Sequence, residues 1–361
     1  MTRTMSTILD FVAGCNARLR DASTPPIIDA RGEPVPGSIA SIEPVRLGGT
    51  EQWVSLRGRD VRNPLFVFVC GGPCASEMAL VRHYNASLED HFVVVMWDYR
   101  GAAKSFDAIY QTPPTLERHV EDLRELVEWL ATRFESRDVY IVGHSWGSVP
   151  ALAFASRFGS RLAGYIGVGQ IVDVERGRQL AYERTLDLAR AEGDRTAVWL
   201  MEQIGPPPYH GRWERIAKHW ALVQAALGRT GQTSVKRVMR EMAAITWRAP
   251  EYSWIDRMNF VRALTVGMAE ALPHTDGIDF VSFAPRLEVP AYFVMGRHDV
   301  LTPPDLVERY VERLEAPRKR IIWFDHAAHL PPYEEPDRFV SAMVEDVLGD
   351  RGPRGRGSMS G

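Results

Sequence analysis

The chain has 361 residues, of which 45% are hydrophobic and 25% are charged, and its formal net charge is -3. This length and hydrophobic content can bury a large core, which fits one large catalytic domain carrying an insertion, or two ordinary domains. Charges of both signs are spread along the chain. It therefore lacks the basic surface that binding to a phosphate backbone requires, and nucleic acid is not an expected partner.

The three cysteines, Cys15, Cys70 and Cys74, are too few and too irregularly spaced for a disulfide framework or a paired zinc site. Their odd number is typical of a reducing compartment, so we expect a cytoplasmic protein without metal or cofactor. The Val-Ala-Gly-Cys sequence that ends at Cys15 resembles a bacterial lipid-attachment box, but the short apolar stretch before it contains Asp10. Residues 6–20 fit an amphipathic helix better, and no stretch approaches the ~20 apolar residues that cross a bilayer.

The first strands are expected after an exposed connection. Residues 1–36 are predicted to form the N-terminal helix and a linker rich in glycine and proline. Strands at 38–46 and 51–57 flank a Gly-Gly pair, which is a hairpin signal. Continuous apolar runs at 65–69 and 92–96 indicate strands that are buried on both faces, as in a parallel sheet.

Helices and strands alternate along the rest of the chain, with one long interruption. The pattern predicts helix 115–134, strand 139–142, helix 145–158 and strand 163–168, and then strand 291–295, helix 304–313, strand 320–324 and helix 336–347. This order indicates an α/β fold with a mostly parallel central sheet and helices on both of its faces.

The interruption predicts the domain organisation. Residues 172–276 read as a helical cap, or lid, inserted into one catalytic domain formed by residues 37–171 and 277–348. The tail at 349–361 is rich in glycine, arginine and serine and is expected to be disordered. Five tryptophans fall in the cap; we expect most of them in its core and some in an apolar binding cleft: Trp199, Trp213, Trp220, Trp247 and Trp254.

A Gly-His-Ser-Trp-Gly sequence at 143–147 carries the first sign of chemistry. It follows a β-branched strand and opens a helix, which is the context in which Gly-x-Ser-x-Gly exposes a nucleophilic serine on a tight turn. A side chain on either side would not fit such a turn, so glycine is required there. Ser145 is therefore the predicted nucleophile, and the alternative is a serine that merely caps the helix.

A serine nucleophile needs a base beside it and a group that orients the base. Asp299 follows the strand that ends at Met295 and is the predicted acid, although an aspartate before a proline-rich helix start can also be a cap. Two histidines, His326 and His329, share the loop after the last strand. His329 is favoured as the base because small residues precede it and prolines follow it, which suits a sharp bend. His298 is expected to be a neighbour of the acid and not a participant, and the remaining histidines, including His144, are expected to be surface or packed residues.

Acyl transfer also needs hydrogen-bond donors aimed at the developing oxyanion. One predicted donor is the backbone N–H of Trp146, directly after the nucleophile. The second is expected in the Cys-Gly-Gly-Pro-Cys loop that begins at Cys70, where Gly72 is the first choice and Gly71 the next.

These motifs together resemble the proline iminopeptidase-like branch of the α/β-hydrolases. That branch is marked by His-Gly-Gly-Pro-Gly, Asp-Gln-Arg-Gly-x-Gly-x-Ser, Gly-x-Ser-Trp-Gly and late Asp and His motifs. Here the corresponding sequences stand at 70–74, 98–105, 143–147 and 328–331, followed by Glu335-Pro336, and the resemblance spans residues 37–339. It implies the α/β-hydrolase fold, a serine nucleophile with the acid and base named above, and an aminopeptidase-like activity.

The chain also departs from the family pattern. Cys70 replaces its histidine, Cys74 and Ala103 replace glycines, and Tyr99 replaces a glutamine. These substitutions leave the backbone N–H donors to the oxyanion in place. The side chains of Cys74 and Tyr99, however, are expected to reshape the acyl pocket. Members that trim peptides hold the free amine of the substrate with acidic residues of the cap; the weak candidates for that role here are Glu77, Glu175, Glu183 and Glu202.

These features favour a serine hydrolase that cleaves an amide or ester of a small molecule or short peptide through an acyl-enzyme on Ser145. One alternative is an acyltransferase that uses the same residues and passes the acyl group to an acceptor other than water. Another is a catalytically silent binding protein, suggested by the altered oxyanion loop. Haloalkane and epoxide chemistry is disfavoured because it uses a carboxylate nucleophile.

Overall fold

The computed structural model describes residues 22–135, 138–209, 212–230 and 235–350. The predicted helix at 6–20 and the tail beyond Asp350 lie outside the described residues. Gly349 and Asp350, which we assigned to the tail, are described, and Asp350 forms an ion pair with Arg318.

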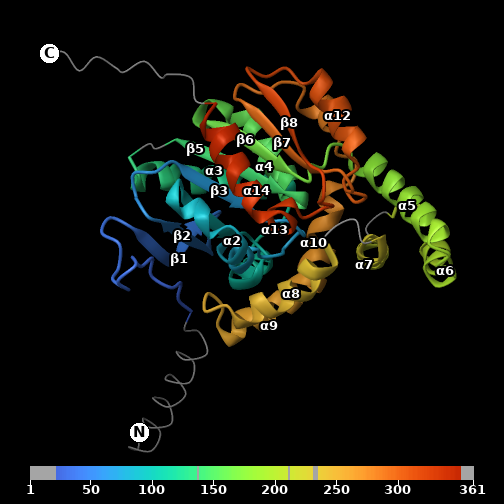
Figure 1. Ribbon diagram of the computed structural model, residues 1–361, viewed down its shortest axis with the longest axis horizontal. Helices are drawn as coiled ribbons and strands as arrows, with labels where there is room; N and C mark the ends of the chain where they lie inside the picture. Colours follow the sequence, from blue (N-terminus) through green and yellow to red (C-terminus); the bar gives the residue numbers. More distant parts are fainter. Residues whose placement is uncertain (1–21, 136–137, 210–211, 231–234, 351–361) are drawn as a thin grey trace, which may run out of the picture.

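A single eight-stranded sheet forms the centre of the molecule (Figure 1). Its strands are β1 (Ile39–Leu47), β2 (Thr50–Gly58), β3 (Leu65–Val69), β4 (Val93–Asp98), β5 (Val139–His144), β6 (Gly164–Val168), β7 (Ala291–Gly296) and β8 (Lys319–Phe324). Their order across the sheet is β1-β2-β4-β3-β5-β6-β7-β8. The pairs β1–β2 and β2–β4 are antiparallel, and all later pairs are parallel. The prediction of a mostly parallel sheet is confirmed.

The hairpin between β1 and β2 turns on two glycines. Leu47 pairs with Thr50, and the two residues between them, Gly48 and Gly49, have φ angles of 57° and 76°. Positive φ at both central residues is the requirement of the tight turns that match the twist of paired strands, and glycine meets it without steric cost.

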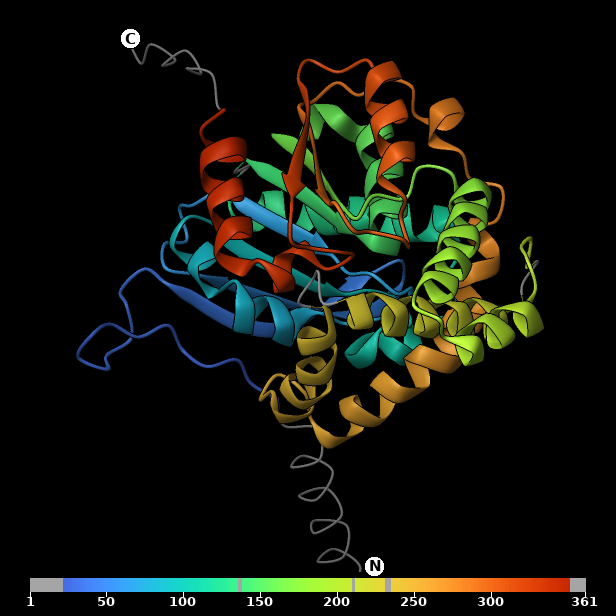
Figure 2. The ribbon, with the colours of Figure 1, turned by 45° about the vertical axis from the view of Figure 1, so that its right-hand side comes forward.

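Helices cover both faces of the sheet (Figures 1 and 2). Helices α2 (Met78–Tyr84), α13 (Pro331–Glu334) and α14 (Pro336–Ser341) lie on one face, and α3 (Leu116–Arg133) and α4 (Ser148–Phe158) lie on the other. The described residues outside the insertion also form α12 (Pro304–Arg313) and four short 3-10 helices, Ala86–Asp90, Ala103–Tyr110, Ser145–Gly147 and Gly159–Arg161. After α14 the chain continues as a π-helix, Ala342–Leu348. Strands β3 to β7 are fully buried, and for β3 and β4 the continuous apolar runs predicted this.

A series of helices is inserted between β6 and β7, where the sequence predicted a helical segment. These are α5 (Val174–Ala191), α6 (Arg195–Ile204), α7 (Trp213–Thr230), α8 (Val235–Arg248), α9 (Trp254–Arg262), a π-helix (Ala263–Gly267), α10 (Met268–Ala271), a 3-10 helix (Leu272–Thr275) and α11 (Phe280–Phe283). Helices α5 to α10 gather at one side of the sheet, coloured yellow-green to orange in Figure 2, whereas α11 packs beside α12. We refer to α5 through α10 as the inserted helices.

Four of the five tryptophans of the inserted helices are exposed, so the prediction that most of them lie in a core is wrong; Trp213 is partly buried against the core. Trp199, Trp220, Trp247 and Trp254 are between 41% and 57% exposed. Amphipathic helices of this segment instead bury smaller residues, such as Ala197 and Met201, and leave the large rings at the surface.

Candidate active site

Ser145 stands on a sterically constrained turn directly after β5. Its φ angle is 52°, a conformation that few residues other than glycine adopt. A Cβ atom at Gly143 would lie 2.6 Å from Ser148 Cα, and one at Gly147 would lie 2.2 Å from the carbonyl oxygen of Val69. Only glycine fits on either side of the serine, and the turn presents the hydroxyl at the carboxyl end of the strand.

The structure brings Ser145, His329 and Asp299 together. His329 Nε2 lies 2.8 Å from Ser145 Oγ, and His329 Nδ1 lies 2.9 Å from Asp299 Oδ2. His329 follows β8 and Asp299 follows β7, so parallel strands deliver all three side chains to one edge of the sheet. The other histidine of the same loop, His326, is exposed. Its location agrees with the choice of His329.

The carboxylate of Asp299 is held by the loop around it. Asp299 Oδ1 accepts the N–H groups of Leu301 and Thr302 at 2.8 and 2.9 Å, and Oδ2 accepts the hydroxyl of Thr302 at 2.5 Å. Burial alone would raise the pKa of Asp299, but the charge and hydrogen bond of His329 and the Thr302 bonds outweigh it, so the pKa is lowered. The carboxylate stays ionised beside the imidazole. It does not cap α12, whose N-cap residue is Pro303.

Gly72 is better placed than Gly71 to donate to an oxyanion. The N–H of Gly71 already donates to Glu77 Oε2 at 2.8 Å. In the part of the chain that the structure describes, the N–H of Gly72 has no protein acceptor. Trp146 is the second residue of the helical turn Ser145–Gly147, where an N–H has no intrahelical acceptor.

Glu77 does not act as a free carboxylate toward substrate, because the chain surrounds it with donors. Its Oε1 lies 2.7 Å from His144 Nδ1 and 2.9 Å from the hydroxyl of Tyr333. His144 Nε2 lies 3.2 Å from the carbonyl oxygen of His329, so both ring nitrogens face acceptors. Burial lowers the pKa of His144, but the charge and hydrogen bond of Glu77, together with the carbonyl of His329, outweigh burial and raise the pKa. Burial likewise raises the pKa of Glu77, and His144 and the other donors lower it overall.

We define Glu77, His144 and Tyr333 as the Glu77 network. It joins the loop at residues 70–74, the turn of Ser145 and the loop of His329. The expectation that His144 is an unspecific packed or surface residue is therefore corrected. Its position immediately before Ser145 was the one signal in the sequence that could have pointed to it. Nothing in the sequence pointed to Tyr333 or to Thr302.

Tyr99 and Cys74 support the oxyanion loop and do not line the cavity, which corrects their predicted effect on the acyl pocket. The hydroxyl of Tyr99 accepts the N–H of Cys74 at 2.7 Å and donates to the carbonyl of Gly71 at 2.9 Å. Both side chains are fully buried. Burial raises the pKa of the thiols of Cys70 and Cys74, so neither is an ionised nucleophile at neutral pH.

The other acidic candidates of the inserted helices lie away from the serine. Glu183 is exposed and accepts from Gln179, and Glu202 is exposed. Glu175 is 3.8 Å from the guanidinium of Arg178. None of the three lines the cavity at Ser145. The interpretation of these residues as binding a substrate amine is not supported by their positions.

A cavity of about 590 Å³ opens beside the serine. Ser145, His329, Gly72 and Trp146 form part of its wall, and the inserted helices form much of the rest. Of the predicted tryptophans, only Trp220 lines it among the described residues. Its size is that of pockets that enclose a small-molecule ligand, ~300–1,000 Å³.

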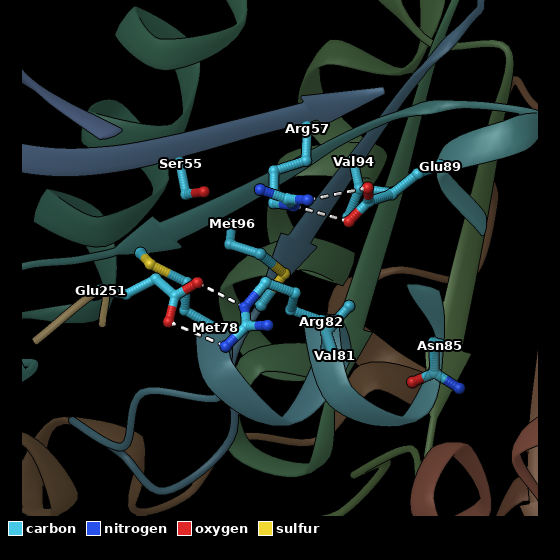
Figure 3. Close-up of a pocket in the computed structure, with 10 residues that line it drawn as sticks. All are labelled: Ser55, Arg57, Met78, Val81, Arg82, Asn85, Glu89, Val94, Met96 and Glu251. Atoms are coloured by element: carbon cyan, nitrogen blue, oxygen red, sulfur yellow. Dashed lines mark hydrogen bonds and ion pairs between the residues drawn. The ribbon is translucent and has the colours of Figure 1, made fainter. Parts of the chain in front are cut away.

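A second cavity beside α2 is too small to be a substrate site (Figure 3). Its volume is about 10 Å³, the minimum that holds a single water molecule. Two ion pairs line it: Arg57 with Glu89, and Arg82 with Glu251 of the loop between α8 and α9. The second pair ties the inserted helices to the sheet domain.

Comparison with known proteins assigns the chain to a family. A family described as serine aminopeptidase, S33, matches residues 67–336, which is most of the chain. The chain belongs to this family. It is therefore a hydrolase, as the sequence predicted.

Individual relatives agree with the assignment. The chain is 29% identical to the "Probable aminopeptidase YbaC" of Bacillus subtilis over 85% of its length and 96% of that protein. It is 24% identical to the proline iminopeptidase of Heyndrickxia coagulans, covering 77% of this chain and 88% of that protein. The crystal structure of a proline iminopeptidase-related protein from Thermus thermophilus superposes with a TM-score of 0.61 at 22% identity, covering 86% and 98% of the two chains. The α/β-hydrolase fold implied by the sequence motifs is confirmed.

A metal-binding cluster and a membrane-spanning helix are both absent from the described residues. No group of three or more His, Cys, Asp or Glu residues there is arranged to hold a metal ion. No described helix is long and apolar enough to span a membrane.

Proposed function

We propose that this chain is a serine hydrolase that cleaves an ester or amide bond of a small molecule or short peptide through an acyl-enzyme on Ser145. The observation that carries the proposal is the 2.8 Å distance between Ser145 Oγ and His329 Nε2. A serine hydroxyl is a poor nucleophile at neutral pH, so it requires a base at this distance. Membership of a hydrolase family supports the same reaction class.

The geometry suggests the order of events. Ser145 Oγ attacks the substrate carbonyl carbon while His329 accepts its proton, and Asp299 orients the imidazole and stabilises the imidazolium. The N–H groups of Gly72 and Trp146 donate to the oxyanion, and such a donor typically contributes about 3 kcal/mol. His329 then protonates the leaving alcohol or amine. Finally it deprotonates a water molecule that attacks the acyl carbon and releases the acid.

Covalent labelling with a fluorophosphonate tests this proposal. We expect the wild-type chain and the control variant Ser156→Ala, altered on helix α4, to be labelled, and Ser145→Ala to be unlabelled. Asp299→Asn should slow labelling by about 10³- to 10⁴-fold, because the imidazole loses its orienting carboxylate. Unchanged labelling of Ser145→Ala would refute the proposal.

A further inference from the structure

The cavity beside Ser145 is built mostly from hydrocarbon. Its walls in and near the inserted helices include Ile216, Met239, Met242, Met268 and Leu272. When a hydrocarbon group enters such a cavity, its own apolar surface and that of the cavity wall both leave water. This burial is the dominant favourable contribution to the free energy of apolar binding. Methionine side chains adapt to ligands of different shape because they are unbranched and flexible.

The charged side chains that line this cavity already have partners within the chain. Glu77 is enclosed by the Glu77 network. Arg178 forms a 2.6 Å ion pair with Asp276, and Asp173 accepts the backbone N–H of Arg176 as the N-cap of α5. An ionised substrate group would therefore have to share a charge that already has a partner, and burial of an incompletely paired charge is costly.

His219 in the cavity wall does not supply a counter-charge either. His219 Nε2 lies 3.4 Å from Thr185 Oγ1, and its Nδ1 lies 3.5 Å from the hydroxyl of Tyr209. Burial lowers the pKa of His219 to about 4, so its imidazole is neutral at pH 7. It offers no positive charge to a substrate carboxylate.

We propose that this cavity binds an apolar, uncharged acyl group attached to the scissile carbonyl, and that a free α-amine on that group weakens the reaction. The inference rests on the proposed function, because it takes Ser145 as the group that attacks the carbonyl. It assigns to this chain a substrate class that differs from the peptides with a free amino end implied by the names of its relatives.

The first test varies the length of the acyl chain while the leaving group is constant. For p-nitrophenyl esters from acetyl to octanoyl, kcat/KM is expected to rise about fourfold for each added methylene until the chain fills the cavity. A constant or falling kcat/KM across the series would overturn the inference.

The second test changes charge without changing the carbon skeleton. Hexanoyl p-nitroanilide and norleucyl p-nitroanilide differ only by the α-ammonium group of the latter. We expect the hexanoyl substrate to be cleaved with at least about a tenfold higher kcat/KM, because the ammonium group would be buried with no carboxylate that is free of other partners. Preference for the norleucyl substrate would overturn the inference.

Two methionine variants locate the effect in the cavity. Met242→Asp places a carboxylate in the wall and is expected to lower the ratio of octanoyl to acetyl kcat/KM at least about tenfold. Met258→Asp alters an exposed methionine of α9 that does not line the cavity, and both rates are expected to stay unchanged. Equal ratios in the two variants would contradict the assignment of this cavity to the acyl group.

Labelling separates failure of this inference from failure of the proposed function. If Ser145 is labelled and acetyl ester is hydrolysed, but chain length has no effect, the substrate assignment is wrong and the hydrolase proposal stands. If the fluorophosphonate does not label Ser145 and no ester is turned over, both are wrong.

Discussion

Glu77 Oε1 and His144 Nδ1 lie 2.7 Å apart, although Glu77 follows the loop at residues 70–74 and His144 immediately precedes Ser145. Both side chains are almost completely buried. The carboxylate also accepts the N–H of Gly71, and the imidazole reaches the carbonyl of His329. This pair therefore positions three segments of the site relative to one another without touching the reacting atoms.

Replacing Glu77 by glutamine tests this positioning role. Glu77→Gln keeps the size of the side chain but removes the charge that raises the pKa of His144. We expect kcat for p-nitrophenyl acetate to fall about 10- to 100-fold, because small displacements of reacting groups cost this much. His144 would also lose its proton at a lower pH, so the alkaline limb of the kcat profile should move to lower pH.

The matched control is Glu121→Gln, which removes a partly exposed carboxylate on α3 that is paired with Arg124. Its kcat and pH profile are expected to equal those of the wild type, since exposed ion pairs contribute ~0–1 kcal/mol. A Glu77→Gln variant with a wild-type pH profile would show that the network does not act through the charge of His144.

Two glycine-to-alanine changes are expected to have opposite effects on stability. A Cβ at Gly147 would lie 2.2 and 2.4 Å from the backbone oxygens of Val69 and Cys70, so Gly147→Ala should cost about 3 kcal/mol or prevent folding. A Cβ at Gly177, inside α5, would make an ordinary 3.9 Å contact with Leu306. Gly177→Ala should therefore increase the free energy of unfolding by about 0.5–1 kcal/mol. Urea unfolding measures both; similar values for the two variants would contradict the steric argument.

His119 is expected to make the protein sensitive to acid. Its ring packs against Tyr99 and Trp146 with centroid distances of 5.2 and 5.1 Å, and its nitrogens have no hydrogen-bond partner among the described residues. Burial lowers its pKa from 6.5 to about 3. Below pH 6.5 the unfolded chain binds the proton first, so stability falls as the pH falls, by about 2 kcal/mol between pH 7 and pH 5.

Urea unfolding at the two pH values checks this prediction. His119→Phe preserves the aromatic packing and should remove about 2 kcal/mol of the loss between pH 7 and pH 5. His91→Gln, at an exposed histidine, should keep the full loss. If the phenylalanine variant is destabilised by acid as much as the wild type, the buried imidazole is not the cause.

Local sequence predicted those features of the site that depend on residues close together in the chain. The glycines at 143 and 147 predicted the constrained turn of Ser145, because steric exclusion there involves the turn itself and the strand beside it. The apolar runs of β3 and β4 predicted a buried parallel sheet. The sequence could predict that Asp299 and His329 lie near Ser145, because each of them follows a strand that ends at the same edge of the sheet.

The sequence alone determined the fold class, the order of the elements and the positions of Ser145, Asp299 and His329 after the ends of strands. This was possible because periodicity and turn chemistry are local properties. Only the tertiary structure decided that Glu77 is enclosed by Tyr333, 256 positions away, that four of the five tryptophans of the inserted helices are exposed and that the cavity is apolar. These facts depend on which distant side chains meet and how much water they exclude. No pattern within a short stretch of chain encodes either quantity.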